Sequence, residues 1–385
     1  MITIHALTLG ANLGLFIFGI LLNMVGPLLP HIVADLNLTM TQAGTLYSMR
    51  GAGIIVAVLF AGMFSDVLGR RKFILTGAAF WILGFLGFAV LSSPWLAVIV
   101  WLIMGLGFGA VDTGLNSLVA EINTEKGAAM NRLHFWFGVG AIVGPLVSQG
   151  LLTFLPWQGV FVAAALLAAG FYAYMYQQTF PVLQRSSTSP WANIRHVWSW
   201  RILLLSFIIL GYTGVGTALM GWMNTFLLER LGTSAWYASI VLAVYSAGLA
   251  VGRLACGAVA ERLAYERLLF ITGTLSAAAL AASLWAPNVV WAGIGFFLTG
   301  FFFAGLLPTS LATANRDFPQ LAGTVTAVLI TFGSIGRTII PGSVGAAADL
   351  YSVTVGLQWL IIIAVGMAGA GWLLNWFRDE EPLEQ

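Results

Sequence analysis

The polar residues of this sequence that could do chemistry lie inside long apolar stretches. Asp112 and Asn116 are four residues apart within the apolar run 95–121, so a helix there places both side chains on one face. A carboxylate accepts hydrogen bonds from several hydroxyl groups, and an amide both donates and accepts them, so the pair suits a polyhydroxylated ligand. Asp112 could equally carry a proton, since a buried carboxyl group readily holds one. The alternative is a structural ion pair, for which Arg50 is the candidate partner.

A second polar segment opens the apolar run 131–155 and contains Asn131, His134 and Trp136. We expect His134 to share a cavity with Asp112, the alternative being a histidine satisfied within the core. Both residues are then candidates for coupling solute movement to an ion. Trp136 offers an aromatic face of the kind that stacks on a sugar ring, although such side chains also face lipid or pack between helices.

Two arginines, Arg50 and Arg337, also fall deep within apolar runs. A charge at the centre of a membrane costs about 2.5–3.5 kcal/mol, so such residues face a cavity or a partner. Because a guanidinium group stays charged and forks onto carboxylates and phosphates, either arginine could bind an anionic ligand or latch two parts of the chain together. Arg253 we expect to be structural. The neutral candidates for the wall of the same cavity are Asn23, Trp222, Asn224, Tyr245 and Thr309.

The composition indicates the class of protein. Hydrophobic residues make up 59% of the 385 residues and charged residues 8%, and the mean hydropathy is +0.94, whereas about 25% of residues are charged in soluble domains. The apolar runs are continuous and about 20 residues long, without the alternation of barrel strands, which indicates membrane-spanning helices. The formal charge of +2 gives no reason to expect a nucleic-acid partner, and the single cysteine, Cys256, excludes an intrachain disulfide. We expect no cleaved signal peptide, because residues 1–9 contain no lysine or arginine.

Twelve apolar runs of helix length follow one another, which predicts an all-α polytopic membrane protein with twelve transmembrane helices. The runs are 6–30, 41–64, 73–92, 95–121, 131–155, 157–178, 201–228, 235–261, 268–286, 289–314, 321–347 and 354–377. The loops that would share a side with the N-terminus hold twelve of the 16 Lys and Arg residues, and the loops on the other side hold only Arg230. The excess of positive charge on one side predicts that both termini are cytoplasmic.

The longest connection, 179–200, contains prolines and serines, so we expect a cytoplasmic linker there. It would join a first six-helix bundle at 1–178 to a second one at 201–385. Glycine landmarks recur at an offset of 195 residues, namely Gly105 with Gly300 and Gly138 with Gly333. The recurrence indicates that the second half of the chain is a duplicate of the first.

The connection between the second and third runs has a regular spacing of glycine, acidic and basic residues. These residues are Gly62, Asp66, Gly69, Arg70 and Arg71, and a degraded copy runs from Gly257 to Glu261 at the same offset of 195. The glycines allow a tight turn, and Asp66 could cap the helix that follows. The spacing resembles the signature of the major facilitator superfamily. The resemblance implies two pseudo-symmetric six-helix bundles with the substrate site at their seam, and a conformational switch formed by these residues together with Glu261.

A finer resemblance rests on about 35 residues of the first half. Asp112 with Asn116, followed by Asn131 and His134, is similar to the paired pattern of the fucose-permease-like branch and its sodium-dependent glucose transporter relatives. It implies that Asp112 is the coupling or sugar-binding carboxylate and that Asn116 and His134 contact the sugar. Where fucose permease has a second carboxylate in its first helix, this sequence has a glycine, and only Asn23 is polar nearby.

The sequence contains no enzyme motif that we can identify. Its four histidines never occur at metal-binding spacing, and it has neither a Gly-x-Ser-x-Gly nor a Walker sequence. We therefore expect a transporter and not an enzyme, with no bound metal and no cofactor other than a co-transported H⁺ or Na⁺.

The resemblance favours a monomer in the lipid bilayer of the cytoplasmic (inner) membrane that moves a small polar solute, a sugar above all, by alternating access. An organic anion or drug-like amphiphile is the alternative solute, since Arg50 and Arg337 with 26 Phe and 15 Trp could line an apolar cavity. A transport-dead sensor on the same fold is the third class.

Overall fold

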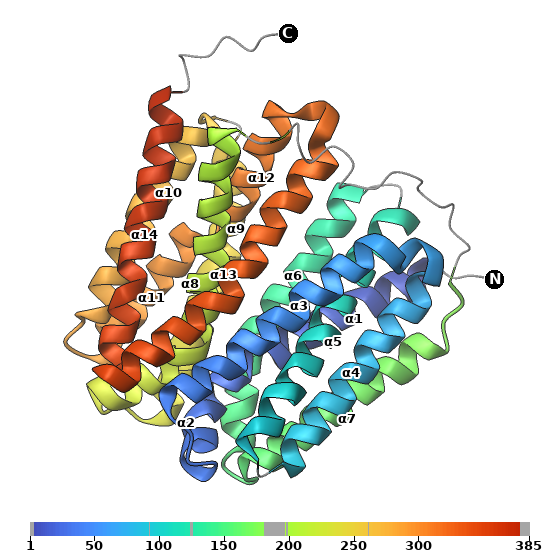
Figure 1. The fold of residues 1–385 in the computed structure, drawn as a ribbon, viewed down its shortest axis with the longest axis vertical. Helices are drawn as coiled ribbons and strands as arrows, with labels where there is room; N and C mark the ends of the chain where they lie inside the picture. Colours follow the sequence, from blue (N-terminus) through green and yellow to red (C-terminus); the bar gives the residue numbers. More distant parts are fainter. Residues whose placement is uncertain are drawn as a thin grey trace.

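The structure is a computed structural model that describes residues 4–91, 93–123, 126–180, 197, 199–260 and 262–377, without the side chains of 61–68, 126–127 and 260. Across these residues the regular structure is entirely helical (Figure 1). The α-helices are α1 (Ile4–Asn23), α2 (Val25–Asp35), α3 (Met40–Leu68), α4 (Arg70–Val90), α5 (Pro94–Ile122), α6 (Lys126–Leu151), α7 (Trp157–Tyr176), α8 (Trp200–Leu231), α9 (Ala235–Ala260), α10 (Tyr265–Leu284), α11 (Val289–Phe303), α12 (Leu306–Asp317), α13 (Ala322–Leu350) and α14 (Val353–Trp376). A short 3₁₀ turn, η2 (Pro319–Leu321), precedes α13.

Two of the membrane crossings are interrupted helices. The segment Ile4–Asp35 is α1 followed by α2, and the segment Val289–Asp317 is α11 followed by α12. The fourteen α-helices of the described chain therefore amount to twelve crossings, as the sequence predicts. Eleven of the described segments are long and apolar enough to cross a membrane by themselves, and α6, which carries Arg132 and His134, completes the set.

The signature segment between the second and third crossings is mostly helical. α3 continues to Leu68, and Gly69 alone joins it to α4. Gly69 has φ of 79°, a conformation that favours glycine, and occupies the N-cap position of α4 without a side-chain hydrogen bond. The connection between the two crossings is therefore a single residue, and Asp66 falls within the last turns of α3. Its expected capping role stays a prediction, because its side chain lies outside the described residues.

The predicted duplication is visible in how the helices touch. Gly105 of α5 lies against the backbone carbonyl of Arg50 in α3 so closely that a Cβ would not fit, and Gly300 of α11 meets the carbonyl of Tyr245 in α9 in the same way. The two contacts are related by the same offset of 195 residues that relates the glycine landmarks. Helices α1–α7 (the first bundle) and α8–α14 (the second bundle) therefore repeat one packing arrangement.

The bundles meet along a seam formed by three pairs of helices. α3 lies against α13, where Gly44 faces Gly342 and Gly51 faces Thr338. α6 lies against α9, and α2 lies against α8. The domain boundaries at 178 and 201 stay a prediction, since most of the predicted linker lies outside the described residues.

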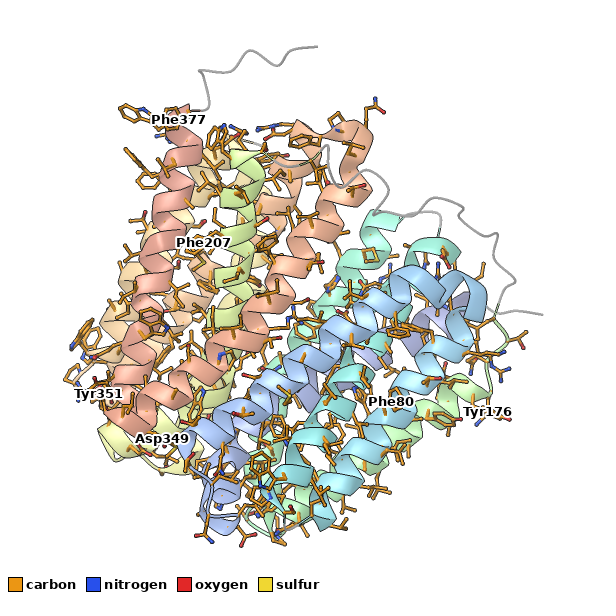
Figure 2. All side chains as sticks on the ribbon, in the orientation of Figure 1. Phe80, Tyr176, Phe207, Asp349, Tyr351 and Phe377 are labelled. Atoms are coloured by element: carbon orange, nitrogen blue, oxygen red, sulfur yellow. The ribbon has the colours of Figure 1, made fainter. Side chains whose placement is uncertain are left out.

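The seam is closed at one end, which we call the Asp349 end because Asp349 at the end of α13 lies beside the start of α3 (Figure 2). The two carboxylate oxygens of Asp349 accept hydrogen bonds from the backbone N–H groups of Met40 and Thr41, each at 2.7 Å. A carboxylate at the first turn of a helix satisfies otherwise unpaired N–H groups and complements the helix dipole. One bundle thus caps a helix of the other.

The opposite end, which carries Gly69, Asn123 and Phe318, we call the linker end. α3 and α13 diverge toward it (Figure 1). On α6, the consecutive residues His134, Phe135 and Trp136 are all exposed, whereas Gly138 already lies against Ala250 of α9. The seam is therefore in contact from the Asp349 end to about the middle of the helices and open beyond.

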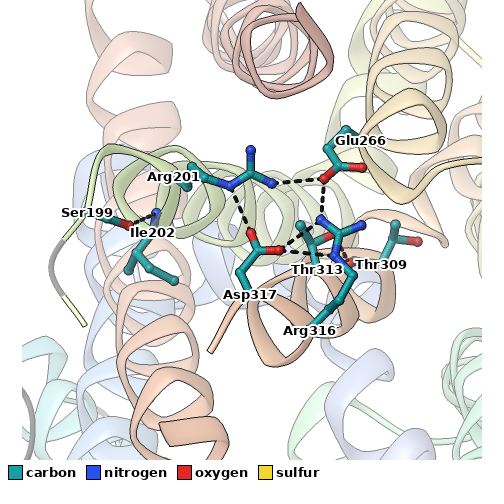
Figure 3. Close-up of polar contacts among 8 residues, drawn as sticks. All are labelled: Ser199, Arg201, Ile202, Glu266, Thr309, Thr313, Arg316 and Asp317. Atoms are coloured by element: carbon teal, nitrogen blue, oxygen red, sulfur yellow. Dashed lines mark hydrogen bonds and ion pairs between the residues drawn. The ribbon is translucent and has the colours of Figure 1, made fainter. Parts of the chain in front are cut away.

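Charged networks at the linker end brace each bundle internally. In the second bundle, Arg201 of α8 donates to Glu266 of α10 at 2.9 Å and to Asp317 of α12 at 2.8 Å, and Arg316 also pairs with both acids (Figure 3). In the first bundle, Arg70 pairs with Glu121 of α5 at 2.6 Å. Each network joins helices of one bundle, so each bundle can move as a unit.

Candidate functional site

Asp112 and Asn116 form a hydrogen-bonded pair on one face of α5. The Asn116 Nδ2 atom donates to the Asp112 Oδ1 atom and to the Asp112 backbone oxygen, both at 2.8 Å. Both side chains are half-buried. The amide N–H groups of Asn116 both donate to Asp112. The second carboxylate oxygen of Asp112 and the Asn116 Oδ1 atom therefore remain available as hydrogen-bond acceptors.

Packing of α5 against its neighbours fixes the place of this pair. One turn before Asp112, the ring of Phe108 lies 5.1 Å from Phe18 of α1 and 5.3 Å from Trp81 of α4. Trp81 and Phe108 are almost completely buried. A carboxylate on such a rigid helix keeps its position without solute, as a pre-organised binding site requires.

His134 of α6 and Asp112 lie near enough for their charges to interact, and the cavity that we expect them to share stays a prediction. The charges of Asp112 and His134 interact directly, and those of Asp112 and Arg337 of α13 do so as well. Arg253 of α9 in turn repels a protonated His134. Since His134 is exposed, the group of charges can be reached from the linker end.

Arg50 does not pair with Asp112, so the ion pair considered from the sequence is wrong. Its guanidinium carbon lies over three aromatic rings instead, 5.0 Å from the centroid of Tyr47, 5.5 Å from that of Trp101 and 5.8 Å from that of Phe108. The cation that faces Asp112 is Arg337, from the other bundle. The position of each arginine within its apolar run predicts its depth in the membrane. It does not predict which of the two arginines points toward α5.

Arg50 and Arg337 share a cavity of about 30 Å³ at the seam. Helices of both bundles contribute to its wall, with α1 and α3 on one side and α8 and α13 on the other. The remaining wall residues are Leu22, Tyr47, Gly51, Ile54, Thr217 and Met220. Tyr47 and Thr217 are absent from the sequence candidates; Tyr47 lies three residues before Arg50 in the same helix, a spacing that could have identified it.

A second tyrosine missed from the sequence, Tyr212 of α8, connects the cations of the second bundle. Arg253 donates to the Tyr212 hydroxyl at 3.4 Å, and Tyr212 interacts electrostatically with Arg337 and with Tyr245 of α9. Tyr245 is fully buried, and in the described part of the chain its hydroxyl has no hydrogen-bond partner. Arg253 thus has the structural contact we expect and also contributes charge to the site.

Three other predicted wall residues are buried in this conformation. Trp222 is fully buried and donates to the Pro341 carbonyl at 3.2 Å. Asn224 donates to Ser239 at 3.1 Å, and Asn23, also buried, donates to the Gly19 carbonyl at 2.9 Å. All three side chains are therefore buried and hydrogen-bonded within their own bundle, and their role in solute binding stays a prediction.

Trp136 and Thr309 lie away from the paired carboxylate and amide. Trp136 is partly exposed and packs edge-to-face on Phe16 of α1, with ring centroids 6.1 Å apart. Thr309 is buried within α12. Neither contact brings a ligand-binding group to Asp112, and their role in solute binding stays a prediction.

Comparison with known proteins gives the family. Residues 11–341 match the model of the Major Facilitator Superfamily. The chain belongs to this superfamily. Among curated relatives, an uncharacterized MFS-type transporter of Yersinia pestis is 25% identical over 93% of this chain and 93% of that protein. The glucose/mannose transporter GlcP of Bacillus subtilis is 23% identical over 96% of this chain and 94% of its own length.

Solved structures share the superfamily fold over nearly the whole chain. The nucleoside transporter NupG superposes with a TM-score of 0.81 at 14% identity, covering 98% of this chain and 99% of that one. A D-xylose–proton symporter superposes with a TM-score of 0.77 at 16% identity, covering 98% and 97%. Because its relatives and fold neighbours are transporters, this member of the superfamily is a multi-pass membrane transporter and not an enzyme.

The superfamily signature is described only in part. Arg70 pairs with Glu121, and Arg71 donates to the Tyr176 carbonyl at 2.6 Å, so both hold α4 to other helices of the first bundle. The side chain of Asp66, the surroundings of Gly62 and the whole of Glu261 lie outside what the structure describes. Their part in the conformational switch of this transporter stays a prediction.

Proposed function

We propose that this transporter is a secondary active carrier of a sugar, which it moves across the cytoplasmic membrane by alternating access between the two bundles, coupled to H⁺ or Na⁺. The observation that carries the proposal is the pair formed by Asp112 and Asn116. It offers acceptor oxygens at a seam that is open toward the linker end, and sugar hydroxyls are the donors that such oxygens bind.

The site draws charged groups from both bundles, which is what alternating access requires. Asp112, Asn116 and His134 belong to the first bundle, and Arg337 belongs to the second. A solute held between the two sets would pull the bundles together at the linker end, and the contacts at the Asp349 end would then have to separate. Seam sites between related bundles are the general design of such transporters.

Two further lines of support point to a sugar. The fourth and fifth crossings resemble the fucose-permease-like branch at Asp112, Asn116, Asn131 and His134. The Bacillus subtilis relative, which matches this chain along almost its full length, is a glucose/mannose transporter. The excess of basic residues at the linker end favours its location in the cytoplasm, and the open seam at that end would then correspond to an inward-open state.

Asp112 and His134 are the groups we assign to coupling. A cation that binds at Asp112 competes with Arg337 for the same carboxylate, so binding of H⁺ or Na⁺ would weaken an attraction that joins the two bundles. The carboxylate thus links occupancy by the ion to the relative position of α5 and α13.

Replacement of Asp112 tests the proposal in proteoliposomes that contain the purified protein. We expect accumulation of labelled D-glucose driven by an H⁺ or Na⁺ gradient, and a fall of roughly tenfold or more in Asp112→Asn, because a hydrogen bond to a charged group contributes about 1.5–3 kcal/mol. Glu229→Gln is the matched control, since Glu229 is an exposed carboxylate at the Asp349 end. Equal uptake by Asp112→Asn and the wild type would contradict the assignment.

A solute with an acidic group is the second candidate. The observation that favours it is the shared cavity of Arg50 and Arg337, two permanent cations that a neutral sugar would leave unneutralised.

A further inference from the structure

We propose that Arg50 and Arg337 form a carboxylate subsite at the seam, so that the solute is an acidic sugar whose hydroxyl groups reach Asp112 and Asn116 while its carboxylate lies between the two arginines. This inference rests on the proposed function and names the substrate class of the same site.

The first support is an excess of positive charge. Arg50 is 3% exposed and has aromatic rings as its close contacts. Arg337 faces Asp112 electrostatically, but within the described residues no ion pair or hydrogen bond joins Arg337 to an acidic side chain. Two guanidinium groups therefore share one cavity and one nearby carboxylate. Unpaired charges in a low-dielectric interior are costly, so the cavity favours an anion.

The second support is a set of buried donors that line the same cavity. The Arg337 Nε atom and the Tyr47 hydroxyl are both buried, and in the part of the chain that the structure describes neither has a hydrogen-bond partner. Both residues belong to the cavity wall. A buried donor without a partner costs free energy, and a carboxylate accepts several hydrogen bonds at once. The rings around Arg50 stabilise its charge but leave its N–H donors available.

The third support is size. The cavity measures about 30 Å³, and a single water needs roughly 10–15 Å³ on the same measure. Two or three small atoms fit, which corresponds to a carboxylate group but not to a hexose ring. The cavity is therefore a subsite for one end of the solute, and the body of the solute lies beside it toward Asp112.

The arrangement also gives the carboxylate a role in the transport cycle. Arg50 comes from the first bundle and Arg337 from the second, and the two cations repel each other when nothing lies between them. A carboxylate that accepts hydrogen bonds from both guanidinium groups would replace this repulsion by an ionic bridge between α3 and α13. The acidic group then contributes to closing the bundles around the solute.

Binding of matched neutral and acidic sugars tests the subsite. The purified full-length protein in nanodiscs is titrated with D-glucose and D-glucuronate, which share a pyranose ring and differ at carbon 6, and with glucose 6-phosphate and acetate. We expect D-glucuronate to bind about 10- to 100-fold more tightly than D-glucose. Arg337→Gln and Arg50→Gln should remove this preference, and Arg337→Lys, which keeps the charge but not the fork, should lose part of it.

Arg267→Gln is the control, because Arg267 is an exposed arginine at the linker end, and a melting temperature equal to that of the wild type shows that each variant is folded. Equal affinity for D-glucose and D-glucuronate, or a preference for D-glucuronate that persists in both glutamine variants, would overturn the carboxylate subsite. Either result would still be consistent with a sugar carrier. Tighter binding of glucose 6-phosphate than of D-glucuronate would replace the carboxylate by a phosphate. Acetate that binds as tightly as D-glucuronate would overturn the acidic sugar, and failure of both sugars to bind would overturn the proposed function itself.

Discussion

At the scale of single residues, the sequence identifies Asp112 because a carboxylate inside an apolar run has few roles other than binding or coupling. Its hydrogen bond to Asn116 follows from the four-residue spacing, because residues four positions apart lie on the same face of an α-helix. Its cationic neighbour could not be predicted. Arg50 and Arg337 lie at similar depth, and only the packing of α3 and α13 decides that Arg337 faces Asp112 while Arg50 lies among aromatic rings.

Asn116 orients the carboxylate and offers an acceptor, so Asn116→Ala should weaken solute binding. We expect the KM for D-glucose uptake to rise by about 10- to 100-fold, the effect of losing a hydrogen bond to a charged group. Asn123→Ala is the matched control, because Asn123 lies at the end of the same helix and donates only to the Val119 carbonyl, at 2.9 Å. An unchanged KM in Asn116→Ala would show that the pair does not bind the solute.

At the scale of helices, hydropathy by itself marks eleven of the described crossings, because each must bury its backbone polar groups in lipid, and α6 is the exception. It does not show the interruptions at Met24 and at Ala304 and Gly305, since no charged residue lies at either break. It also ends the second crossing a few residues too early and begins the third a few residues too late, since α3 runs to Leu68 and α4 begins at Arg70. Charge marks the end of the membrane core, whereas the backbone conformation of glycine marks the end of the helix.

The close contact of α3 and α5 predicts a large effect of one methyl group. In Gly105→Ala the new Cβ would collide with the Arg50 backbone, and overpacking of this kind costs about 1–3 kcal/mol. We expect a lower melting temperature by differential scanning fluorimetry, together with weaker D-glucuronate binding because Arg50 must shift. Gly170→Ala is the control, since a Cβ at Gly170 has no neighbour within 4 Å, and its melting temperature should stay equal or rise. Equal melting temperatures of the two variants would contradict the packing.

At the scale of the whole molecule, the duplication is readable from the sequence because both bundles use glycine at equivalent helix contacts, Gly105 with Arg50 and Gly300 with Tyr245. The conformational state is not readable. The cap that Asp349 places on α3 joins residues more than 300 positions apart, and no local pattern announces such a contact. A carrier that alternates between two states also encodes both in one sequence, so the sequence alone favours neither.

The central claim is that a solute bound near Asp112 closes the linker end while the Asp349 end opens. Spin labels in a Cys256→Ser background measure it most directly, with one pair at Lys72 and Arg267 at the linker end and another at Leu155 and Tyr351 at the Asp349 end. All four side chains are exposed.

We predict that D-glucuronate or D-glucose shortens the Lys72–Arg267 distance and lengthens the Leu155–Tyr351 distance in the same sample, and that Asp112→Asn abolishes both changes. Two distances that stay constant while the sugar is bound, or that change in the same direction, would contradict the account.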